Sequence, residues 1–125
     1  MRLIGEYYKE KILSQKKLKK VELPSNSGEV KVEKDLFGWK LYAGKEFIEC
    51  DSEEEARLLK IFLEYGMREV RIPKDYEYLK TLVPELEKIK NKTDKIINGA
   101  LRSILNRKIR EKARYEILME LTKYE

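Results

Sequence analysis

The residue types that most often carry proton transfer in enzymes are scarce in this sequence. Histidine is absent, so the single cysteine, Cys50, has no imidazole to activate it as a nucleophile. We expect Cys50 to be a small buried residue at the end of a strand. One cysteine cannot form an internal disulfide, which favours a reducing, cytoplasmic location. The sequence therefore predicts no catalytic residue and a protein that is not an enzyme.

Carboxylates gather in two places where a metal ion would need them. Asp51 is followed by residues 53–55 (EEE), but three consecutive residues on a helix point in different directions. The Glu-x-Lys of GEVK at 28–31 resembles part of a nuclease metal site, yet Pro24 is followed by Ser25 where such sites carry an aspartate. We therefore expect no metal and no cofactor, and a metal-dependent nuclease-like enzyme is the third interpretation of the chain.

Positive charge is concentrated at the two ends of the chain. Residues 1–20 carry seven Lys/Arg against two acids, a net charge of +5, and residues 91–114 carry eight against two, a net charge of +6. Residues 21–50 and 51–70 have net charges of −2 and −3. Such a separation of sign favours a polyanionic partner more strongly than the overall charge of +5 does.

The two basic ends suggest a protein that binds DNA or RNA through phosphates. Neutralising several phosphates releases counterions, whereas no motif for sequence-specific base contacts is present. The alternative is a solvated surface, because charged residues form 41% of the chain and Lys/Glu enrichment is typical of hyperthermophiles. The candidate phosphate contacts are Lys16, Lys17, Lys19, Lys20, Arg102, Arg107, Lys108, Arg110, Lys112 and Arg114.

The C-terminal region also supports a rival interpretation from another class, a protein-interaction subunit that binds no nucleic acid. Its apolar residues recur every four positions, which drifts around a helix of 3.6 residues per turn. So wide a band needs cover on more than one side, so we expect a homodimer or a subunit of a larger complex. The candidate interface residues are Ile97, Leu101, Leu105, Ile109, Ala113, Ile117 and Leu121.

The elements that position these residues follow from periodicity. Spacing of three to four predicts an amphipathic helix over 3–19, ending in KKLKK, and PSNSG at 24–28 predicts a linker. Alternation in EVKVEK, WKLY and KEFIEC predicts three antiparallel strands, with hairpin turns near Phe37-Gly38 and at Ala43-Gly44.

A helix should follow the third strand, beginning at Ser52 and ending at Gly66. The sequence Ser-x-x-Glu at its start is a capping box, and glycine suits the position just after a helix. REVRI at 68–72 predicts a fourth strand that Pro73 closes.

Beyond residue 74 the pattern is helical. Pro84 predicts a break between a short helix at 75–82 and a longer one, which Asn98-Gly99 would kink or split. Whether 84–123 forms one helix or a hairpin stays open. We therefore expect an α+β fold: an N-terminal helix, a three- to four-stranded mainly antiparallel module with a packed helix, and a helical C-terminal region. The expected division is 1–73 and 74–125, with no membrane span and no secretory signal.

The order of these parts resembles a known family. Residues 29–123 follow the order of the GINS replication subunits whose β domain comes first, and KEFIECDSEEEARLLKIFLEYGMREVRIPKDY resembles the end of that domain. NRKIREKA resembles the family's basic helix. About fifty residues follow Pro73, fewer than the family's helical domain has, and residues 1–20 have no counterpart. The resemblance implies an archaeal subunit of a DNA-replication complex and carries over no functional residue beyond the basic helix.

Overall fold

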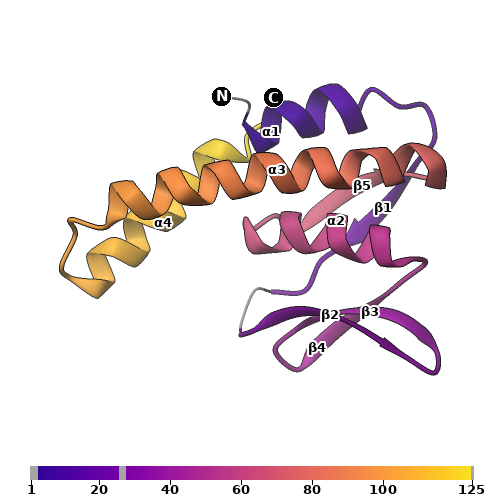
Figure 1. The fold of residues 1–125 in the computed structure, drawn as a ribbon, viewed down its shortest axis with the longest axis horizontal. Helices are drawn as coiled ribbons and strands as arrows, with labels where there is room; N and C mark the ends of the chain where they lie inside the picture. Colours follow the sequence, from indigo (N-terminus) through magenta and orange to yellow (C-terminus); the bar gives the residue numbers. More distant parts are fainter. Residues whose placement is uncertain (1–2, 26–27, 125) are drawn as a thin grey trace.

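A computed structural model describes residues 3–25 and 28–124 and has the expected α+β fold (Figure 1). A helical turn at the N-terminus continues directly into a π-helical turn, and a long helix near the C-terminus folds back as a hairpin. The elements are α1 (Ile4–Tyr7), η1 (Tyr8–Ile12), β1 (Leu18–Glu22), β2 (Val30–Asp35), β3 (Gly38–Ala43), β4 (Glu46–Cys50), α2 (Glu53–Glu64), β5 (Glu69–Pro73), α3 (Tyr76–Leu101) and α4 (Arg107–Leu121).

The strands form two separate antiparallel sheets. The meander β2–β3–β4 forms one of them, and β1 pairs with β5 in the other. In the meander, Leu41 lies opposite Val32 and Ile48, and this face packs toward α2. Gly44 follows β3 with a φ of 63°, which glycine adopts without strain in a tight hairpin turn. The fourth strand expected at 68–72 is therefore present, but it does not join the meander.

The expectation of one helix over 3–19 is wrong in its second half. Helical structure ends at Ile12. The first two lysines of KKLKK lie in the loop before β1, and its last three residues begin the strand. The reason is tertiary: Val70 and Ile72 on β5 are fully buried, and the backbone of β5 needs a hydrogen-bonding partner. Lys19 lies opposite Ile72 in this pairing. A long-range strand pairing outweighs a local preference for helix here.

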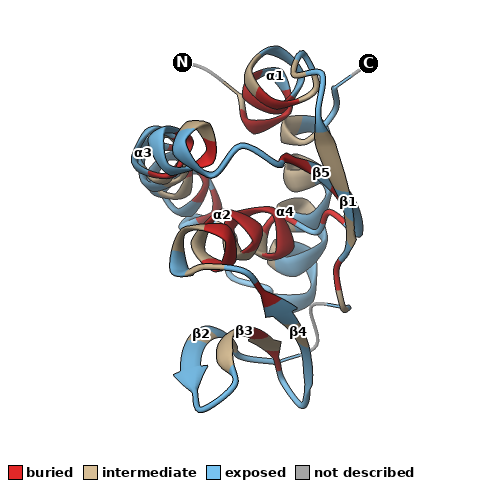
Figure 2. Cartoon of the chain, turned by 90° about the vertical axis from the view of Figure 1, so that its right-hand side faces the viewer, coloured by how far each residue is buried: buried red, intermediate tan, exposed pale blue. Residues whose placement is uncertain are grey.

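The helix α2 is built as its sequence signals indicate. The Ser52 hydroxyl accepts a hydrogen bond from the Glu55 amide at 3.1 Å, which caps the first turn. Gly66 ends the helix with a φ of 85°. The face with Leu59 and Phe62 is buried against the rest of the core, so α2 forms the centre of the molecule (Figure 2).

Pro84 does not interrupt the helix, so the separate helix expected at 75–82 does not form. The proline lies inside α3, which runs for 26 residues, or about 39 Å at 1.5 Å per residue. A proline inside a helix costs about 3 kcal/mol. Pro84 faces solvent, while its neighbours Leu82, Val83 and Leu86 are buried. This burial on both sides of the proline holds the helix together.

The C-terminal region is a helical hairpin whose break falls at 102–106 and not at Asn98-Gly99. The side chain of Asn106 accepts hydrogen bonds from the amides of Lys108 and Ile109, at 2.9 and 3.2 Å, and so begins α4. The hydrophobic core extends from α1 through α2 to the first half of α3, but α4 contributes no buried residue. Across 3–25 and 28–124, no helix is both long and apolar enough to cross a membrane.

Candidate nucleic-acid interface

Arginines from the end of α3 and the start of α4 meet at the closed end of the hairpin, beside the turn at 102–106. Arg102 follows the last residue of α3, and Arg110 and Arg114 stand one turn apart on α4. Together with Asn98 and Leu101 they line a shallow hollow of about 300 Å³. The sequence placed all three arginines among the phosphate contacts, and the structure brings them to one site because the chain turns back at 102–106.

Among the described residues, those that line this hollow include no carboxylate. The Arg114 guanidinium donates to the amide oxygen of Asn98 at 2.8 Å, which holds one fork of the arginine in place. Within 3–25 and 28–124, Arg102 and Arg110 have no ion-pair partner. Arg107 is mostly exposed and pairs with Glu111 at 3.0 Å. The hollow is therefore a small concave surface with three positive charges and no local neutralisation.

The lysines of the N-terminal basic segment lie elsewhere. Lys16 and Lys17 are exposed in the loop before β1, and the carbonyl of Lys17 accepts a hydrogen bond from the Lys74 amide at 3.1 Å. This bond places the loop beside the start of α3, whereas Arg102 follows its end (Figure 1). The two basic clusters thus lie at opposite ends of α3, a helix about 39 Å long. They do not form one continuous surface.

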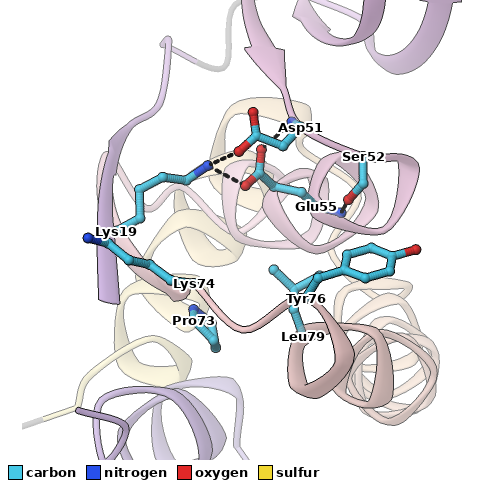
Figure 3. A pocket seen from close by; sticks show the side chains of 8 residues that line it. All are labelled: Lys19, Asp51, Ser52, Glu55, Pro73, Lys74, Tyr76 and Leu79. Atoms are coloured by element: carbon cyan, nitrogen blue, oxygen red, sulfur yellow. Dashed lines mark hydrogen bonds and ion pairs between the residues drawn. The ribbon is translucent and has the colours of Figure 1, made fainter. Parts of the chain in front are cut away.

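Lys19 is already occupied by acids of the same chain. Its ammonium group bonds Asp51 at 2.9 Å and Glu55 at 2.5 Å, and Glu55 is 5% exposed (Figure 3). Burial acts to lower the pKa of Lys19, but the bonds to Glu55 and Asp51 outweigh it and leave the pKa raised. Lys20 lies 3.6 Å from a carboxylate oxygen of Glu69. Neither lysine is a free contact for a phosphate.

A cavity of about 660 Å³ lies beside Lys19, with Asp51 and Glu55 in its wall (Figure 3). Its wall includes Lys74, Tyr76 and the Ser52 hydroxyl, which is engaged as the cap of α2. Sequence reasoning explained Glu55 as a capping residue and missed its pairing with Lys19. Only the position of β1 next to α2 reveals that pairing. Lys19, Glu55 and Ser52, three of the polar residues that line this cavity, are bonded to one another's elements.

Cys50 is buried at the end of β4, as the sequence predicted. It is 8% exposed, and burial together with the charge of Glu55 raises its pKa from 9.0 to about 12. A thiol with so high a pKa is a poor nucleophile at neutral pH. Among the residues that the structure describes, no group of three or more potential metal ligands occurs.

The seven apolar candidates for a protein interface differ in how far they are buried. Ile97 and Leu101 are buried within the chain, at 3% and 2% exposure. Leu105 and Ile109 are exposed at the turn and on the first turn of α4, at 92% and 59%. The remaining candidates, Ala113, Ile117 and Leu121, are half-buried. The structure therefore does not present the seven residues as one surface.

Comparison of the chain with protein-family models, with curated proteins and with solved structures gave no match.

Proposed function

We propose that this protein binds nucleic acid through phosphates at the arginine hollow formed by the end of α3 and the start of α4. The observation that carries the proposal is the convergence of Arg102, Arg110 and Arg114 on one concave surface without a lining carboxylate. Guanidinium groups bind phosphate oxygens in a two-pronged geometry and stay charged at every physiological pH. DNA and RNA both offer the required chemistry.

The neighbouring residues favour a backbone contact over base recognition. Asn98 orients Arg114, while Arg107 and Lys108 extend the positive surface around the first turn of α4. Phosphate contacts position a protein on the nucleic acid without selecting a sequence. Lys16 and Lys17 form a separate accessory contact at the other end of α3. A role in the cytoplasm as a subunit of a DNA-handling complex, which the GINS resemblance implies, belongs to the same proposal.

A titration of duplex and single-stranded DNA at several salt concentrations tests this proposal. About four phosphate contacts give a log–log slope near −4 on duplex DNA, because each contributes about −0.9. The double variant Arg102→Glu and Arg110→Glu should lose most of the affinity and about two units of the slope. The matched control reverses Lys34 and Lys45 on the meander, which changes the net charge equally.

The control variant should keep its affinity to within about threefold, because its charges lie on the β2–β4 sheet far from the hollow. Equal losses in both variants would show that net charge alone attracts the nucleic acid. No binding by the wild type at about 50 mM salt would overturn the proposal altogether.

A second candidate function, protein assembly, is favoured by one specific observation. None of the 15 residues of α4 is buried, although the helix carries Ile109, Ile117, Leu118 and Met119. A helix in a monomeric domain normally buries an apolar stripe.

A further inference from the structure

The side of α4 that faces away from α3 carries a short stripe of four exposed residues. Ile109, Lys112, Glu116 and Met119 are spaced by three, four and three positions, so they line one face of the helix. Ile109 is 59% exposed and Met119 is 52% exposed. Half-buried residues of this helix, among them Arg114, Ile117, Leu118 and Leu121, lie on the opposite side.

The two charges in the middle of the stripe are not satisfied within the chain. Lys112 and Glu116 are exposed, and within 3–25 and 28–124 neither has an ion-pair partner, although Arg107 pairs with Glu111 at the same spacing. Lysine placed four residues before glutamate is the weaker order for an intrahelical pair. The stripe thus presents one positive and one negative group between two apolar ends.

This order of residues is complementary to itself when two helices run antiparallel. The two-fold axis would cross the exposed face of α4 at the level of position 114. It sets Ile109 against Met119 of the partner subunit, and Lys112 against Glu116 of the partner subunit. The same axis sets Lys108, on the flank of the stripe, against Glu120 of the partner subunit. We propose that a second copy of this chain docks antiparallel on this face of α4 and forms a two-fold symmetric dimer.

Charge explains why the partner is a second copy in this orientation. A parallel pairing would place Lys112 against Lys112 of the partner subunit and Glu116 against its own copy, which like-charge repulsion opposes. The basic half of α4, 107–114, instead meets the acidic half, where Glu116 and Glu120 lie. Two residues of the hollow, Arg110 and Arg114, are half-buried on the α3 side. The dimer therefore leaves the three arginines of the hollow open and engages only Lys108 at the margin of the positive surface.

The contact is small. A helix of 15 residues is about 22 Å long, and one such pair buries less surface than a stable obligate dimer needs. We therefore expect dissociation constants of about tens of micromolar, with monomer and dimer in exchange. Salt should weaken the dimer, because its central pairs are exposed ion pairs.

Sedimentation equilibrium of the full chain without nucleic acid, from about 5 to 500 µM, tests the proposal. Lys112→Glu sets four carboxylates at the centre of the contact and should weaken the dimer by about tenfold or more. Glu116→Lys should do the same. The double variant, Lys112→Glu with Glu116→Lys, restores both pairs and should return to within about fivefold of wild type.

Lys88→Glu serves as the control, since Lys88 is exposed on α3 and should leave the dimer unchanged. Circular dichroism of each variant establishes that α4 still forms, so a loss of dimer cannot be a loss of fold. A wild type that stays monomeric at 500 µM overturns the proposal. So does a dimer that Lys112→Glu leaves intact, or a double variant that stays as weak as the single ones. DNA binding measured on the same variants tests the proposed function separately, so either proposal can be contradicted without the other.

Discussion

Glu55 uses both oxygens of its carboxylate to join three parts of the chain. Oε1 accepts from the Lys19 ammonium on β1 at 2.5 Å, and Oε2 accepts from the Asp51 amide at 2.7 Å. The side chain therefore holds β1 against the start of α2. Asp51 adds little, because its side chain is 87% exposed and a pair in water is weak.

Removing this carboxylate should destabilise the fold. We expect Glu55→Ala to lower the free energy of unfolding by about 2 kcal/mol, less than for a fully buried pair because Lys19 is 35% exposed. Urea denaturation measures the loss. Glu53→Ala, an exposed acid in the same helical turn, is the control and should cost less than about 0.5 kcal/mol. Equal costs for the two variants would mean that Glu55 acts only on the helix dipole.

Cys50 makes the stability of the protein fall at high pH. The folded state holds the thiol proton up to a pKa of about 12, whereas the unfolded chain releases it near 9.0. Stability from this group is therefore complete below pH 9 and is lost as pH rises toward 12. Cys50→Ala should flatten this part of the stability curve and cost about 1 kcal/mol at pH 7. Parallel urea titrations of both proteins from pH 7 to 11 measure the difference, and identical slopes would contradict the prediction.

At the residue scale, the sequence was informative where a residue is defined by its neighbours in the chain. Ser52 and Gly66 bound α2 because capping and positive φ are local requirements. The pairing of Lys19 with Glu55 could not be predicted, since 36 positions separate them. The arginine hollow could be predicted in part. Its three arginines were identified from the sequence, but their meeting at one site depends on the turn at 102–106, which the sequence did not locate.

At the scale of elements, the errors share one physical cause. The end of KKLKK forms the start of β1 and not a helix, and Pro84 lies inside α3 and does not break it. In both cases burial outweighs a local preference of a few kcal/mol or less: β5 is buried where Ile72 lies opposite Lys19, and Leu82 and Leu86 are buried on either side of Pro84. A single sequence contains the local preference but not the contact that overrides it.

The end of α4 is attached to the rest of the molecule at one close contact with the N-terminal helix. A Cβ atom on Gly5 would lie 1.9 Å from the carbonyl oxygen of Lys123, a distance that no side chain can occupy. Beside it the ring of Tyr124 packs edge-on against Tyr8, with centroids 5.1 Å apart. Only glycine at position 5 lets the two segments approach so closely.

Gly5→Ala should therefore detach the C-terminal end of α4 from α1. We expect a loss of about 1–3 kcal/mol and faster tryptic cleavage within α4. Gly99→Ala provides the matched control, because nothing lies within 4 Å of its added Cβ and it stands inside a helix. That variant should stabilise α3 by up to about 1 kcal/mol. An unchanged cleavage rate in Gly5→Ala would show that α4 is held by other contacts.

At the scale of the whole molecule, residues on both sides of the expected division at 73–74 pack together. Ile72 and Leu79, on either side of it, belong to the same hydrophobic cluster as Phe62. The end of α3 and most of α4 extend beyond this cluster, where Figure 1 shows the hairpin projecting from the body. Only Leu118 of α4 packs against the main core.

This distribution of burial predicts a gradient of local stability, which hydrogen exchange can measure. Amides of α2 and of α3 near Leu82 and Leu86 should exchange slowest, because opening them exposes the core. Amides of α4 should exchange fastest among the helices in dilute protein, since that helix contributes no buried residue. Raising the protein concentration into the range of the proposed dimer should slow α4 selectively, and Lys112→Glu should abolish that effect. Protection of α4 equal to that of α2 in dilute protein would contradict the gradient, because it would require contacts that the exposed surface of α4 does not make.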